Sequence, residues 1–190
     1  GVLPKDPSPL RLGRGAQTEV EERLRAARTN VLHALSHGAR QVVVVTSAGP
    51  REGASTTAAG LARVLALSGH RVVLVGGDLR SPSAVGAPGA PGLAEVLVGT
   101  ARLSQVLVEG EVPGLELLPA GDMPGNPSEL LGGRNMSDLL HHLAADRIVI
   151  VDAPPVCRFT DAVVLAEYAG GVLLVARAGR TSAEELREAA

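Results

Sequence analysis

The sequence contains three runs of apolar, mostly β-branched residues, at Gln41–Thr46, Arg71–Val75 and Arg147–Val151. Such unbroken runs are typical of parallel strands that are buried on both faces. Each run is followed by a turn or loop and then by a helical pattern. This order predicts a doubly wound α/β sheet with helices on both sides, a three-layer αβα architecture. We therefore expect Thr46, Gly76 and Asp152 to lie together at the carboxyl edge of a mostly parallel sheet.

The other segments continue this alternation of helices and strands. Helices are predicted at 18–37, 55–68, 93–98, 101–108, 135–144, 160–168 and 182–190, and further strands at 115–118 and 171–176. Thr18 and Glu21 form a capping-box pattern at the start of the first helix. Segments rich in Pro and Gly at 81–91 and 120–127 predict loops.

Length and composition limit the class of protein. The 190 residues, 45% of them hydrophobic, are enough for one domain at 17–190, preceded by a linker at 1–16. A net charge of −2 and very few aromatic residues give no preference for nucleic acid. The single Cys157 cannot form an internal disulfide, which favours a reducing compartment. No apolar run reaches the ~18 residues that span a bilayer and no leader opens the chain, so we expect a soluble domain.

The segment between the first strand and its helix has the layout of a phosphate loop. It consists of Ala48, Gly49, Pro50, Arg51, Glu52, Gly53, Ala54, Ser55 and Thr56. A phosphate loop needs converging backbone N–H groups and a helix N-terminus, then a Lys for the phosphates and a Ser or Thr for magnesium. Here Ala54 stands in the place of the Lys, Ser55 supplies the hydroxyl, and Ala48 replaces the first Gly. Taken alone, the segment fits an ordinary Gly-rich turn equally well.

Two carboxylates strengthen the nucleotide interpretation. Asp78 follows the second strand and Asp152 follows the third. Groups at the carboxyl ends of parallel strands lie in the crevice where such sheets bind ligands, and carboxylates there can hold magnesium. One such Asp is more often a turn residue, but two beside a phosphate loop favour a metal–nucleotide site. We therefore predict that Ser55, Asp78 and Asp152 hold Mg²⁺ together with ATP or ADP.

These motifs together resemble the bacterial tyrosine kinases of polysaccharide assembly, the BY-kinases. That family has a Walker A loop, a Walker A′ strand ending Asp-x-Asp-x-Arg and a Walker B strand ending Asp-x-Pro-Pro. The similarity covers nearly the whole chain. The segments that resemble the family are Asp78-Leu79-Arg80, Asp152-Ala153-Pro154-Pro155, Glu22-x-x-Arg25-x-x-Arg28, Asn126–Leu131 and Thr160-Asp161-Ala162. In addition, Gly1–Pro4 resembles the segment that follows the last transmembrane helix in family members.

The sequence also departs from that family pattern. Ala54 replaces the Walker A Lys, and Gly76 replaces the first Walker A′ Asp, to which the resemblance assigns activation of the substrate tyrosine. The sequence ends in a predicted helix, before the last strand and the tyrosine-rich tail of active members. Its one tyrosine, Tyr168, is expected to pack rather than to be phosphorylated. Phosphoryl transfer depends on positioning and electrostatics, so loss of the lysine predicts impaired catalysis, with Asp78 and Asp152 left as catalytic residues.

The resemblance implies a kinase-like domain on the cytoplasmic side of the bacterial inner membrane. It would regulate capsule or exopolysaccharide synthesis or export and bind ATP/ADP-Mg weakly or not at all. Its partners would be a membrane polysaccharide co-polymerase or its own transmembrane segment, and further copies of itself, possibly in a ring, through Glu22, Arg25 and Arg28. Three alternatives stay open: an active autokinase in which Ala54 is an engineered change, a partition-type ATPase, and a structural module with an empty site. The partition-type ATPases carry a signature Lys near the start of the loop, where Gly49 stands here.

Overall fold

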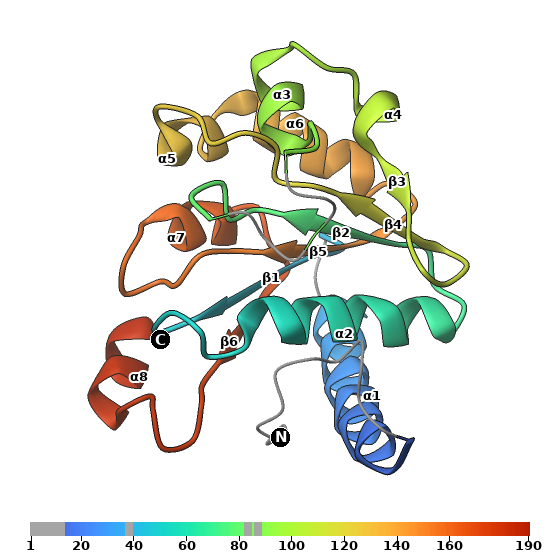
Figure 1. The fold of residues 1–190 in the computed structure, drawn as a ribbon, viewed down its shortest axis with the longest axis vertical. Helices are drawn as coiled ribbons and strands as arrows, with labels where there is room; N and C mark the ends of the chain where they lie inside the picture. The colour runs from blue at the N-terminus through green and yellow to red at the C-terminus, as the bar shows by residue number, and fades with distance from the viewer. Residues whose placement is uncertain (1–13, 37–39, 82–84, 86–88) are drawn as a thin grey trace.

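The apolar runs form the centre of a six-stranded sheet in the computed structural model, which describes residues 14–36, 40–81, 85 and 89–190 (Figure 1). The strand order is β3-β4-β2-β5-β1-β6. The strands are β1 (Val42–Ser47), β2 (Val72–Gly76), β3 (Val108–Glu109), β4 (Leu115–Leu118), β5 (Ile148–Asp152) and β6 (Gly171–Val175). All neighbours pair in parallel except β3 and β4, which are antiparallel. The expected doubly wound, mostly parallel sheet is confirmed.

The register brings the ends of the three central strands to one edge. Gly76 pairs with Asp152, and Asp152 also pairs with Val45, so Thr46 is the next residue along β1. Because these strands are parallel, all three ends lie at the carboxyl edge of the sheet. The predicted clustering of Thr46, Gly76 and Asp152 is therefore confirmed.

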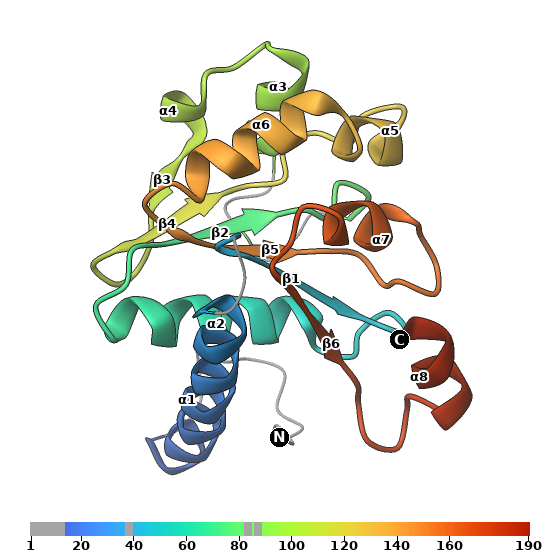
Figure 2. The ribbon, with the colours of Figure 1, turned by 180° about the vertical axis from the view of Figure 1, so that it is seen from behind.

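Helices cover both faces of the sheet (Figures 1 and 2). The helices are α1 (Arg14–Ser36), α2 (Ala54–Leu67), α3 (Leu93–Val98), α4 (Leu103–Val106), α5 (Pro127–Leu131), α6 (Arg134–Leu143), α7 (Asp161–Ala166) and α8 (Ala183–Ala189). Alternate strand residues point to opposite faces. Val43 and Val45 pack with α1 and α2 in one core, whereas Val42 and Val44 pack in the other core with α3, α6 and α7. The helix α8 buries none of its residues and projects from the end of β6.

Helix α1 packs directly on α2 through a close approach at Gly60. A Cβ on Gly60 would lie 2.7 Å from Cδ1 of Leu24, so a side chain there would force the Leu24 side chain to shift. Leu24, Val31 and Leu35 form the buried side of α1. The charged stripe predicted on α1 therefore lies on a helix that the core holds firmly in place.

Several boundaries differ from the predicted ones. Helix α1 begins at Arg14 rather than Thr18, because only Gly15 disfavours helix in the intervening residues. The helix therefore begins within the linker predicted at 1–16. Residues 1–13 lie outside the described part of the chain, as does residue 37, the predicted end of this helix. Most of the predicted loop 81–91 also lies outside it.

The helix predicted at 101–108 is wrong in its second half. Only Leu103–Val106 is helical, and Val108 and Glu109 instead pair with Leu117 and Glu116 as the short strand β3. Pairing with the free side of β4 outweighs local helix preference here. The structure adds the short helix α5, and α7 ends at Ala166, before Tyr168. No described helix is both long and apolar enough to cross a membrane.

Candidate functional site

The loop between β1 and α2 has a backbone shaped by two left-handed residues. Gly53, which precedes α2, has φ 102°, a conformation that a glycine adopts without strain. Arg51 has φ 59° and is the only described non-glycine residue with positive φ. Ala54 is the first residue of α2 and is buried, so the position expected for a phosphate-binding lysine carries only a methyl group.

Glu52 ties this loop to the connection between β6 and α8. Its buried carboxylate accepts a hydrogen bond from the N–H of Gly49 at 3.0 Å and another from the hydroxyl of Thr181 at 2.6 Å. Arg177 adds a hydrogen bond from its guanidinium to the carbonyl of Arg51 at 3.2 Å. Sequence reasoning missed Thr181 and Arg177, because no local pattern marks contacts between residues more than 120 positions apart.

The segment after β5 closes the opposite side of the loop. The hydroxyl of Thr46 donates to the carbonyl of Pro154 at 2.7 Å, and the N–H of Val156 donates to the carbonyl of Ser47 at 2.9 Å. Cys157 follows this turn and is partly buried. Burial and the nearby carboxylates of Glu188 and Glu185 raise the pKa of its thiol above the usual value, which disfavours a reactive thiolate.

Asp152 is a buried carboxylate without a partner. Its side chain is 1% exposed, and neither oxygen has a hydrogen-bond partner among the described residues. Burial raises the pKa of Asp152 to about 7. The nearby hydroxyl of Ser55 lowers this pKa, and the negative charge of Asp78 raises it by a smaller amount. An unpaired buried carboxylate is costly unless a cation or a proton compensates it.

Asp78 lies half-buried on the turn after β2. Its Oδ1 atom accepts hydrogen bonds from the backbone N–H groups of Arg80 at 3.1 Å and Ser81 at 3.2 Å. Burial raises the pKa of Asp78 above its usual value despite these hydrogen bonds. The turn passes very close to β5: a Cβ on Gly77 would lie 2.9 Å from the carbonyl oxygen of Asp152.

The arrangement of Asp152, Asp78 and Ser55 suits a magnesium ion that is held with a nucleotide. Among the described residues, no three His, Cys, Asp or Glu side chains gather closely enough to hold a metal alone. Mg²⁺ is usually bound by one or two carboxylates together with phosphate oxygens and water. The unpaired oxygens of Asp152 are the feature that most strongly favours such an ion.

Arg80 joins three segments that are distant in sequence. Its Nε atom donates to Oδ2 of Asp161 at 2.6 Å, and one terminal nitrogen donates to Oδ1 of Asp161 at 3.1 Å and to the hydroxyl of Ser128 at 2.9 Å. Ser128 also donates to Asp161, and the guanidinium lies 4.5 Å from the ring centroid of Phe159. The Walker A′ tail, the 126–131 segment and the Thr160-Asp161-Ala162 motif thus meet at one side chain.

Comparison with known proteins identifies the family. YwqD, a tyrosine-protein kinase of Bacillus subtilis, is 37% identical over 172 residues, which cover 88% of this chain and 73% of that protein. The solved kinase domain of Escherichia coli ETK superposes with a TM-score of 0.84 at 32% identity, covering 90% of this chain and 68% of that one. The chain belongs to the BY-kinase family. No family model matches it.

Other relatives are also named tyrosine-protein kinases, and they show how much of such a protein this chain covers. The putative tyrosine-protein kinase EpsB of Ralstonia nicotianae is 39% identical over 171 residues. The chain covers 23% of that protein, so it spans about a quarter of the length of such relatives. The septum site-determining protein MinD of Pyrococcus horikoshii, bound to Mg-ADP, matches with a TM-score of 0.56 at 20% identity, which shows a shared fold alone. The chain is therefore grouped with the BY-kinases and not with the partition-type ATPases.

In this BY-kinase domain, the stripe expected to mediate oligomerisation lies on α1, apart from the phosphate loop (Figure 1). Glu22 and Arg25 are exposed and form an ion pair at 3.1 Å, while Arg28 is partly buried. Tyr168 packs on the core, and its hydroxyl donates to the carbonyl of Gly132 at 3.0 Å. The side chain thus has a structural contact, in keeping with the expected packing role.

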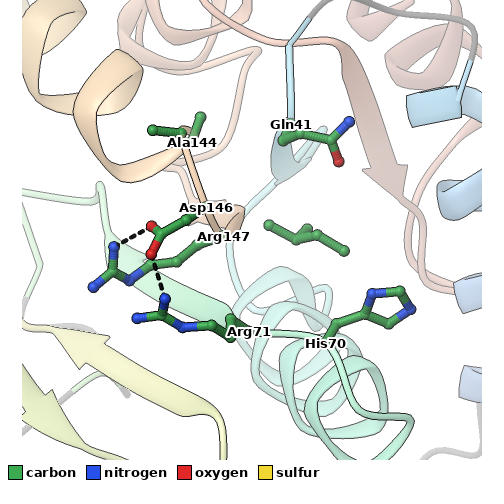
Figure 3. Close-up of a pocket in the computed structure, with 8 residues that line it drawn as sticks. Gln41, His70, Arg71, Ala144, Asp146 and Arg147 are labelled. Carbon is green, nitrogen blue, oxygen red and sulfur yellow. Dashed lines mark hydrogen bonds and ion pairs between the residues drawn. The ribbon is translucent and has the colours of Figure 1, made fainter.

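The opposite, amino edge of the sheet carries a paired ion cluster (Figure 3). Arg147 donates to Glu116 at 2.6 Å and to Asp146 at 2.5 Å, and Arg71 also binds Asp146. Arg71, Asp146 and Arg147 border a pocket that Gln41, His70 and Ala144 help to line. Both guanidiniums of this cluster have carboxylate partners, so no unpaired charge among these described residues marks it as a ligand site.

Proposed function

We propose that this domain is a kinase-like regulatory module of capsule or exopolysaccharide assembly, which binds Mg-nucleotide weakly and is catalytically impaired. The observation that carries the proposal is the contrast within the site. Asp152 is buried and unpaired, as a magnesium site requires, whereas Ala54 offers no charge to the phosphates. The carboxylate that would bind the metal is retained, and the lysine that would bind the phosphates is missing.

The roles of the residues follow from their positions. The backbone N–H groups at the start of α2 would bind phosphate oxygens, and Ser55, Asp78 and Asp152 would hold the magnesium ion. ATP would supply the phosphoryl group. Without a lysine at Ala54, the negative charge on that group is poorly compensated during transfer. Gly76, the last residue of β2, has no carboxylate to activate a tyrosine hydroxyl.

Arg51 is the one cation within the loop, and it does not replace the lysine directly. Its side chain is exposed and lies three residues before Ala54, on the far side of the Gly53 bend. A guanidinium at this place would approach the phosphates from outside the loop. We therefore propose that it contributes to weak nucleotide binding and does not restore catalysis.

The cellular setting follows from the family. The relatives that the chain matches over about a quarter of their length are named tyrosine-protein kinases. The resemblance to the kinases of polysaccharide assembly supports a place on the cytoplasmic side of the inner membrane. The membrane partner would be a polysaccharide co-polymerase or a transmembrane segment of the same protein.

Isothermal titration calorimetry with ADP and ATP, with and without Mg²⁺, tests the proposed site. We expect Ala54→Lys to bind Mg-ADP about tenfold more tightly than the parent, which corresponds to ~1.4 kcal/mol. Ala54→Met, of similar length but without charge, is the matched control. Equal tightening by both variants would contradict the electrostatic account. Absence of binding in the parent and in Ala54→Lys would support the alternative of an empty structural module.

Self-association through α1 is the second part of the proposal. An exposed ion pair such as Glu22–Arg25 contributes only about 0–1 kcal/mol to the fold. Arginines can grip carboxylates of a neighbouring copy in a two-pronged geometry, and repeated head-to-tail use of one surface can close a ring. We expect Arg25→Ala/Arg28→Ala to weaken association in light scattering over a concentration series, with and without nucleotide. Equal association of parent and double variant would reject this interface.

A further inference from the structure

Arg80 lies only two residues after Asp78, and its guanidinium is held by another carboxylate. Asp161 is fully buried and takes two hydrogen bonds from Arg80, at 2.6 Å and 3.1 Å. The Arg80 side chain is 29% exposed and lies over the ring of Phe159. A bidentate pair in a buried setting fixes a guanidinium far more firmly than an exposed contact would.

With the guanidinium of Arg80 held by Asp161, no described side chain forms an ion pair with Asp78. The backbone N–H groups of Arg80 and Ser81 both bind Oδ1 of Asp78, and no described residue donates a hydrogen bond to Oδ2. Although burial raises the pKa of Asp78, the positive charge of Arg80 already acts to lower it, so an Arg80 released from Asp161 would be free to pair with Asp78. An arginine paired with Asp78 would neutralise the carboxylate that the proposed metal site needs.

We propose that Asp161 is a positioning residue that draws the guanidinium of Arg80 away from Asp78 and so keeps Asp78 open to a divalent cation. The inference rests on the proposed function, because it assigns Asp78 to the magnesium–nucleotide site. It goes beyond that function by giving the buried Asp161 at the start of α7 an indirect role in metal binding.

The surroundings of Asp161 support this role. Burial alone would raise the pKa of Asp161, but the hydrogen bonds from Arg80 and Ser128 and the charge of Arg80 hold it below the usual value. Asp161 therefore stays charged and remains a permanent partner for Arg80. Ser128 contributes a neutral hydrogen bond and leaves both charges in place, so its removal is a matched control.

Manganese titrations in the presence of ADP, followed by the electron paramagnetic resonance of the ion, test the proposal. We expect Asp161→Asn to weaken Mn²⁺ binding about tenfold or more, as changes behind a metal ligand commonly do, and Ser128→Ala to weaken it much less. The decisive variant is Arg80→Gln/Asp161→Asn, in which no guanidinium remains to occupy Asp78. Recovery of Mn²⁺ affinity in this double variant supports the proposal. A folded double variant that binds as weakly as Asp161→Asn would overturn it.

A measurement without ligand separates this inference from the proposed function. The Nε–H signal of Arg80 in nuclear magnetic resonance spectra reports its partner. In the Asp161→Asn background, a further Asp78→Asn change should shift this signal, because Arg80 has moved to Asp78. In the parent, Asp78→Asn should leave it nearly unchanged. If the Arg80 signal of the Asp161→Asn variant does not shift when Asp78→Asn is added, the inference is wrong, even if Mn²⁺ binds. If Mn²⁺ fails to bind the parent and Ala54→Lys, the proposed function fails, while this signal still tests the pairing.

Discussion

The two edges of the sheet are built from the same strands but treat their charges in opposite ways. At the amino edge, Arg147 and Arg71 share Asp146 (Figure 3), and Arg147 also pairs with Glu116. At the carboxyl edge, Asp152 is more deeply buried than any of these groups and has no partner among the described residues. The charged groups at one end of the sheet are therefore paired, whereas the other end keeps a buried carboxyl group without a partner among the described residues.

This difference shows where function has shaped the fold. Buried polar groups in proteins are nearly always paired, and exceptions concentrate at sites that bind a ligand. The same edge holds the strained backbone of Arg51. Ala54 stands where the lysine is expected, while the unpaired Asp152 and the left-handed Arg51 are present at the same edge.

The largest effect should come from neutralising Asp152. Its pKa of about 7 in the folded protein lies above the usual carboxyl value, so the unfolded chain loses this proton at lower pH than the folded one. Stability is therefore lost as pH rises through this window, and the penalty is complete above about pH 7. We predict that Asp152→Asn raises the free energy of unfolding by about 2–4 kcal/mol at pH 8, and by less at pH 5.

Urea unfolding at both pH values, without magnesium or nucleotide, measures this effect. The gain at pH 8 should exceed the gain at pH 5. A variant that is less stable than the parent at pH 8 would mean that Asp152 has a stabilising partner, and the contrast between the two edges would disappear.

A smaller effect of opposite sign is expected at the amino edge. Arg147→Met would leave Glu116 without its partner and should lower the free energy of unfolding by about 2 kcal/mol, below the range for fully buried pairs because both side chains retain some exposure. Arg134→Met is the control, since its pair with Asp138 is highly exposed and is expected to contribute about 0.5 kcal/mol or less. Equal losses in the two variants would show that the amino-edge cluster adds no special stability.

The smallest predicted effect concerns the strained loop. Arg51→Gly relieves a left-handed conformation but makes the unfolded chain more flexible, so we predict a net gain of about 0.5 kcal/mol. Gly53→Ala places a side chain at φ 102° and should instead cost about 1 kcal/mol or more. Thermal unfolding compares the two variants. A clear loss of stability in Arg51→Gly would indicate that the guanidinium makes a stabilising contact.

The sequence predicts those parts of the fold that depend on local residue patterns. The β-branched runs gave the central strands, and their ends placed Thr46, Gly76 and Asp152 at one edge, as the strand register confirms. The short strand β3 was not predictable, because two residues carry no periodic signal and their pairing with β4 is a tertiary effect.

The candidate site divides in the same way. Loop residues and carboxylates at strand ends occur at fixed spacings in a motif. The sequence alone therefore identifies Ser55, Asp78 and Asp152 as candidate site residues. The contact of Glu52 with Thr181 and the closure of Arg80 on Asp161 join distant segments, and only the folded chain brings them together. The family resemblance marked the segment that contains Asp161 but could not assign its partner.

We propose that this BY-kinase domain keeps a metal–nucleotide site without the groups needed for phosphoryl transfer. Autophosphorylation with γ-labelled ATP, followed by mass spectrometry of Tyr168, tests it most directly. The account predicts no detectable incorporation in the parent protein and none in Asp152→Ala. Labelled phosphate on Tyr168 of the parent that is abolished in Asp152→Ala would contradict it.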